Sequence, residues 1–94
     1  MHILLVDDEI HATNALKEFL EDDYGISIRN NGQEALEFLK KEKVDLVITD
    51  HNMPLMTGME LIKQGKKLFP DCFFVMLTAH SSLDHAIEAL RTGA

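Results

Sequence analysis

The 94-residue sequence has few of the features that mark secreted, membrane or nucleic-acid-binding proteins. Cys72 is the only cysteine, so no disulfide can form within the chain, which fits a reducing compartment. No apolar run approaches the ~20 residues that a membrane-spanning helix needs, and the first apolar run is too short for a signal peptide. Basic residues are outnumbered, and the net charge of −7 disfavours non-specific binding to phosphates. We therefore predict a cytoplasmic protein that binds neither membranes nor nucleic acid directly.

The composition is typical of one small globular domain. Hydrophobic residues make up 46% of the chain and charged residues 27%, which are ordinary values for a globular protein. The sequence contains no internal repeat, low-complexity segment or linker. We therefore expect residues 1–94 to form a single domain.

Short apolar runs alternate with segments of helical periodicity. The apolar runs predict four strands, "HILLV", "GISIR", "VDLVIT" and "CFFVMLT". Helices are predicted over residues 10–21, after Asn31, over residues 59–68 and after Ser81 or Ser82. Asn31, with Glu34 three residues on, suggests a variant of the capping box, although Asn31-Gly32 could also form a hairpin turn. Gly65 weakens the third predicted helix.

The order of these elements, βαβαβαβα, predicts the fold class. Apolar strands without alternation, separated by helices, indicate a parallel sheet that is covered on both faces. Right-handed crossovers leave few topologies, and the flavodoxin-like one is a three-layer α/β/α fold with strand order 2-1-3-4. In such a sheet, ligands bind beyond the carboxyl ends of strands 1 and 3. These strands end at Asp7 and Asp50, so we expect Asp7, Asp8 and Asp50 to converge on one crevice.

Three neighbouring carboxylates repel one another, and a hard divalent cation such as Mg²⁺ relieves the repulsion. An aspartate can also act as a nucleophile and form an acyl phosphate. A bound metal would screen an incoming phosphoryl group from the charge of that aspartate. Thr78, at the end of the neighbouring apolar run, is placed to bind a phosphoryl oxygen through its hydroxyl.

The motifs "LLVDDE", "VITDHNMP" with Gly58 beyond it, and "VMLTA" resemble the response-regulator receiver domain of two-component signalling. Their order and spacing match over the whole chain. The resemblance implies a CheY-like fold and a phosphoacceptor domain that is not a conventional enzyme. It also implies a histidine kinase as the partner that supplies the phosphoryl group.

The resemblance also implies a role for each matching residue. Asp50 corresponds to the phosphoacceptor, and Asp7 and Asp8 to the acids that hold Mg²⁺. The backbone carbonyl of Asn52 corresponds to the third protein ligand of the metal. Thr78 corresponds to the hydroxyl that moves toward the phosphoryl group, and Ala79 to the small residue that leaves room for it.

Each of these residues also has a simpler interpretation. Asp7 and Asp8 could be a solvated strand end and a helix cap, Asp50 a turn residue, and Thr78 only a strand residue. His51 and His80 flank the predicted site, where we expect them to affect access or phosphoryl lifetime rather than to bind metal. For Met53 and the two later methionines of the same loop region, packing is favoured over a partner surface.

The resemblance implies that a receiver domain continues, after the position of Ala94, into a fifth strand and a fifth helix. That segment carries a lysine that pairs with the phosphoryl group. We therefore interpret the 94 residues as an incomplete receiver domain. The fourth strand would then be a sheet edge, and we expect self-association or a domain swap through it. A binding-only or assembly module without a working switch is the alternative function. A Mg²⁺-dependent phosphatase is disfavoured, because its second acid typically lies two residues after the nucleophile.

Overall fold

The computed structural model describes residues 1–50, 53 and 55–77 and shows a parallel sheet between two layers of helices. The strand order is β2-β1-β3-β4, and each neighbouring pair is parallel. The elements are β1 (His2–Val6), α1 (Ile10–Leu20), β2 (Gly25–Arg29), α2 (Gly32–Lys41), β3 (Leu46–Asp50), α3 (Gly58–Leu68) and β4 (Phe73–Leu77). The predicted flavodoxin-like fold and strand order are confirmed. The predicted helix after Ser81 lies outside the described residues.

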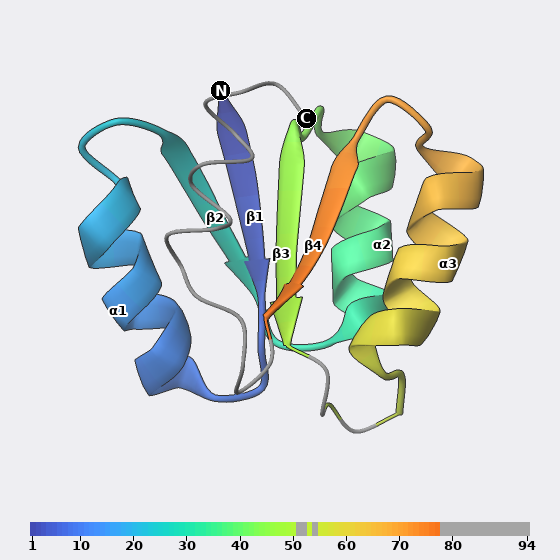
Figure 1. Cartoon of the computed structure of the whole chain (residues 1–94), viewed down its shortest axis with the longest axis horizontal. Helices are drawn as coiled ribbons and strands as arrows, with labels where there is room; N and C mark the ends of the chain where they lie inside the picture. The colour runs from blue at the N-terminus through green and yellow to red at the C-terminus, as the bar shows by residue number, and fades with distance from the viewer. Residues whose placement is uncertain (51–52, 54, 78–94) are drawn as a thin grey trace.

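The helices cover opposite faces of the sheet, with α1 on one side and α2 and α3 on the other (Figure 1). Successive side chains of β1 point to opposite faces: Ile3 and Leu5 pack in the core under α1, and Leu4 and Val6 in the core under α2 and α3. All four are at most 1% exposed. Because both faces are buried, β1 has no polar alternation, which is the pattern that identified it in the sequence.

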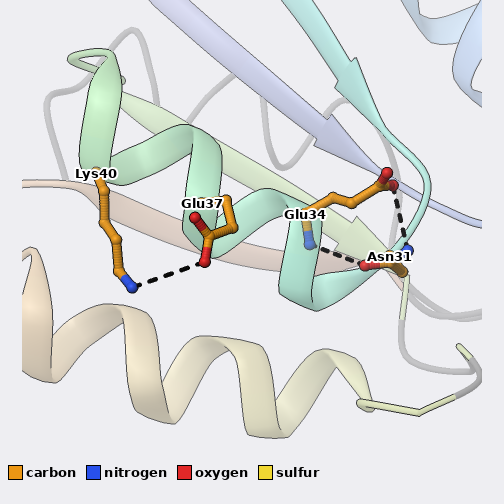
Figure 2. A network of polar contacts seen from close by, with 4 residues as sticks. All are labelled: Asn31, Glu34, Glu37 and Lys40. Carbon is orange, nitrogen blue, oxygen red and sulfur yellow. Dashed lines mark hydrogen bonds and ion pairs between the residues drawn. The ribbon is translucent and has the colours of Figure 1, made fainter.

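Helix α2 begins at the residue that the sequence suggested, with a different set of cap contacts. The Asn31 side chain accepts a hydrogen bond from the Glu34 backbone N–H at 2.8 Å and donates to the Glu34 carboxylate at 3.2 Å (Figure 2). The carboxylate therefore binds the cap side chain, whereas a full capping box would bring it to the cap backbone. The hairpin alternative is wrong, because Gly32 is the first residue of α2. The Glu37–Lys40 pair in Figure 2 is exposed and contributes little.

Helix α3 begins with a capping box that was not predicted from the sequence. Thr57 accepts a hydrogen bond from the Glu60 backbone N–H, and the Glu60 carboxylate accepts one from the Thr57 backbone N–H, both at 3.2 Å. This complete capping box fixes the start of α3 at Gly58, one residue before the predicted start.

Cys72 lies just before β4 and is buried. Burial, and to a smaller degree the charge of Asp45, raises the pKa of its thiol to about 11. The thiol is therefore protonated at neutral pH, which agrees with a structural role for this residue.

Gly65 allows α3 to approach β4 closely. A Cβ atom at this position would clash with the ring of Phe74, which packs against the core under α2 and α3. In the sequence, Gly65 is predicted to weaken the helix. In the fold, its missing side chain is what makes room for the aromatic ring.

Gly65→Ala is expected to lower the free energy of unfolding by about 1–3 kcal/mol, because overpacking against Phe74 outweighs the better helix propensity of alanine. Urea unfolding measures the change. Gln64→Ala, at an exposed position of the same helix, is the control and should be nearly neutral. A Gly65→Ala variant more stable than the wild type would contradict the close-packing account.

Candidate functional site

Three aspartates meet at the carboxyl end of the two central strands. Asp50 is the last residue of β3, and Asp7 follows the last residue of β1. The two strands are neighbours, with Val6 opposite Thr49. Each of Asp7, Asp8 and Asp50 offers a carboxylate oxygen, and these oxygens all lie within 4.8 Å of one another. The structure thus brings together the three acids that the sequence placed in one crevice.

Hydrogen bonds of the backbone hold Asp7 in place. Its backbone N–H donates to the carbonyl of Arg29 at 3.2 Å, which continues the pairing of β1 with β2 by one residue. Its carboxylate accepts a hydrogen bond from the Glu9 backbone N–H at 2.9 Å. Asp7 is therefore anchored on one side by the sheet and on the other by the turn that leads into α1.

The position of Asp7 makes its negative charge unfavourable. Burial raises the pKa of this carboxyl most, and the nearby Asp50 and Asp8 raise it further. The hydrogen bond from the Glu9 N–H acts in the opposite direction and is outweighed. Asp7 and Asp50 are half-buried, whereas Asp8 is exposed. The cluster therefore has a solvent-facing side and an inner side.

A small pocket of about 40 Å³ lies beside the acids. Its lining includes Asp7, Asp50 and, on the inner side, Leu5, Thr13, Leu16 and Ile48. A space of this size holds a water molecule or a small ion rather than an organic ligand. The acids are the charged groups of this lining, so the pocket favours a cation over an anion.

Two described residues of the connection between β3 and α3, Met53 and Leu55, differ in burial and backbone conformation. Met53 is buried in the core under α2 and α3 and Met56 packs against that core, as predicted for the loop methionines. The prediction is wrong for Met59, which lies in α3 and is 42% exposed. Leu55 is 93% exposed and has a φ of 73°, in the left-handed region that disfavours a branched side chain. The backbone at Leu55 is thus held in an unfavourable conformation.

Several predicted site residues fall outside the described residues. These are Asn52, Thr78 and Ala79, together with the flanking His51 and His80. Their predicted roles stay predictions. His2 lies at the opposite end of the sheet, where its ring contacts the Ser27 hydroxyl at 2.7 Å and the Lys43 carbonyl at 3.1 Å. His2 therefore links β1 to β2 and to the segment before β3, at the end of the sheet away from the acids.

Thr49, which precedes Asp50, was not predicted to belong to the site. This side chain is fully buried, and its hydroxyl donates to the backbone carbonyl of Asp50 at 3.0 Å. The sequence does contain a sign of this role, because Thr49 is a polar residue at the end of the otherwise apolar run "LVIT".

Comparison with known proteins agrees with this geometry. Residues 3–94 match the family model described as "Response regulator receiver domain". The chain is 40% identical over 93 residues to the transcriptional regulatory protein ZraR of Klebsiella oxytoca, covering 98% of this chain and 21% of that protein. It is 35% identical over 91 residues to the regulatory protein LuxO of Vibrio cholerae, covering 96% and 20%. The chain therefore spans about a fifth of the length of these relatives.

Solved structures show the same fold. The chemotaxis protein CheY4 of Vibrio cholerae superimposes with a TM-score of 0.80 at 32% identity, covering 99% of this chain and 80% of that one. The response regulator TrrA of Thermotoga maritima, solved in complex with Mg²⁺-BeF, superimposes with a TM-score of 0.81 at 28% identity, covering 97% and 96%. The described strands are parallel and in the order 2-1-3-4, with an acid cluster at their carboxyl ends, and the chain belongs to the response-regulator receiver family.

Proposed function

We propose that this chain is a phosphoacceptor module in which Asp50 receives a phosphoryl group from a histidine kinase. The observation that carries the proposal is the convergence of Asp7, Asp8 and Asp50 within 4.8 Å at the end of the sheet, in a member of the receiver family. In the transfer, a carboxylate oxygen of Asp50 attacks phosphorus, a P–O bond forms, and the P–N bond to the kinase imidazole breaks. The module is a signalling domain rather than a conventional enzyme.

Mg²⁺ fits the donor set that the structure shows. The cluster offers only oxygen ligands, and octahedral Mg²⁺ with bonds of about 2.0–2.1 Å brings its ligand oxygens to roughly 3–4 Å from one another. Small side-chain rotations bring the three carboxylates, already within 4.8 Å, into that range. Asp7, Asp8 and Asp50 would hold the ion, and the backbone carbonyl of Asn52 is proposed as a further ligand. The ion supplies positive charge that stabilises the charge of the transferring phosphoryl group.

The remaining roles in the proposal come from the family motifs. Thr78 binds a phosphoryl oxygen and starts the conformational change, and Ala79 leaves room for the group. The proposal includes a cytoplasmic location, which the single cysteine and the kinase partner favour. No helix in the described part of the chain is long and apolar enough to cross a membrane.

Incubation with a small phosphodonor and Mg²⁺ is expected to add one phosphoryl group to the chain, detected as a gain in intact mass. Asp50→Asn should abolish the gain, because the amide is a poor nucleophile, and removal of Mg²⁺ should reduce it strongly. Asp71→Asn, at an exposed position near β4, is the matched control and should leave the gain unchanged. If the folded wild-type chain gains no mass, the chain is better described as a binding-only or assembly module.

Asp7→Asn is expected to raise the free energy of unfolding at pH 7 in the absence of Mg²⁺, by about 1 kcal/mol or less after solvent screening. The pKa of Asp7 is raised in the folded state, so the folded chain binds this proton more tightly than the unfolded chain. Protonated Asp7 therefore stabilises the fold. This contribution is complete below about 3.9, the pKa of an aspartate in the unfolded chain, and is lost as the pH rises through the higher pKa of Asp7 in the folded chain.

Urea unfolding of both proteins at pH 4 and pH 7 measures this difference. The advantage of the variant should grow with pH, and saturating Mg²⁺ should reverse it. Asp22→Asn, in the exposed connection between α1 and β2, is the matched control. A variant that is less stable than the wild type at pH 7 without Mg²⁺ would contradict the inference that folding disfavours the charge of Asp7.

Self-association through β4 is also part of the proposal. Among the described strands, β4 is paired with β3 alone, and its Phe73 is 52% exposed. An apolar strand edge of this kind pairs readily with another chain. Sedimentation at micromolar concentration is expected to show dimers or larger species, and a result with monomer alone would contradict this part.

A further inference from the structure

Thr49 places a hydroxyl group inside the buried part of β3, directly before Asp50. The side chain is 0% exposed, so its hydroxyl has left water and needs partners within the protein. It donates to the backbone carbonyl of Asp50 at 3.0 Å and lies 3.9 Å from the sulfur of Met53. Valine has the same shape and suits a buried strand at least as well. Packing alone therefore does not account for the hydroxyl group at this position.

The two contacts of this hydroxyl lie on either side of positions 51 and 52 in the sequence. The Asp50 carbonyl belongs to the peptide unit that leaves the strand, and Met53 is buried in the core under α2 and α3. A hydrogen bond to that carbonyl restricts rotation of the backbone at Asp50. Since the side chain of Asp50 follows its backbone, the same bond restricts where the carboxylate can lie relative to Asp7 and Asp8.

We propose that Thr49 is a positioning residue for the acid cluster. Its hydroxyl holds the Asp50 carbonyl and Met53 in one arrangement and thereby keeps the Asp50 carboxylate ready to bind Mg²⁺. The inference rests on the proposed function, since it assigns a task to a neighbour of the proposed phosphoacceptor. Groups that orient metal ligands without touching the metal commonly affect affinity.

Two substitutions separate the hydroxyl from the rest of the side chain. Thr49→Val keeps the shape and removes the hydroxyl, whereas Thr49→Ser keeps the hydroxyl and removes a methyl group. Three quantities are measured for each: Mg²⁺ affinity by calorimetry, the rate of Mg²⁺-dependent phosphorylation by a small phosphodonor, and unfolding by urea without Mg²⁺. Val47→Ala, in the same strand and core, is the control for a loss of stability without loss of the hydroxyl.

Thr49→Val is expected to weaken Mg²⁺ binding about threefold to tenfold and to slow phosphorylation at limiting Mg²⁺. Thr49→Ser and Val47→Ala should stay within about twofold of the wild-type affinity even if both are less stable. A Thr49→Val variant with wild-type affinity would overturn the inference. So would a Thr49→Ser variant that is weakened as much as Thr49→Val, because packing would then explain both.

If Thr49→Val does not fold without Mg²⁺, the Mg²⁺ affinity of Thr49→Ser tests the inference instead. Wild-type affinity in Thr49→Ser supports the inference, and a tenfold loss overturns it. If the wild type binds Mg²⁺ without being phosphorylated, the proposed function fails, while the affinities still test the role of Thr49. If the wild type does not bind Mg²⁺, both proposals fail.

Discussion

Mutual repulsion among three carboxylates is the constraint on which the candidate site depends. Asp7, Asp8 and Asp50 are held within 4.8 Å of one another, and the pKa of Asp7 is raised, most by burial and further by the charges of Asp50 and Asp8. The arrangement persists because β1 and β3 are buried on both faces and tightly paired. Burial of the central strands therefore stabilises a site that is unfavourable by itself, and a divalent cation removes the cause of the instability.

The fold creates this site through the direction of its strands. Parallel strands bring their carboxyl ends to the same edge, so two acids that are 43 positions apart in the sequence meet beyond neighbouring strands. The same burial gives the site rigid support, since Asp7 is hydrogen-bonded to the end of β2 and Asp50 to the hydroxyl of Thr49. The acids are thus joined to backbone that cannot move without disturbing the core.

The sequence predicted the features that depend on pattern along the chain. The strands followed from apolar runs, the start of α2 from Asn31 and the meeting of the acids from parallel topology. Features that depend on contacts between distant residues could not be obtained in this way. Gly65 was interpreted as a weak point because its role depends on Phe74, nine residues later in another element. Thr49 was overlooked because only the structure shows which carbonyl and which sulfur its hydroxyl meets.

The central claim is that the three acids form one divalent cation site. Titration of the ¹⁵N-labelled chain with Mg²⁺, followed by amide chemical shifts, tests it most directly. The account predicts one saturable transition, with the largest shifts at residues 7–9 and 48–53, where the acids and their supporting backbone lie. Shifts that do not saturate, or that are largest at the exposed acids 21–23 between α1 and β2, would contradict it.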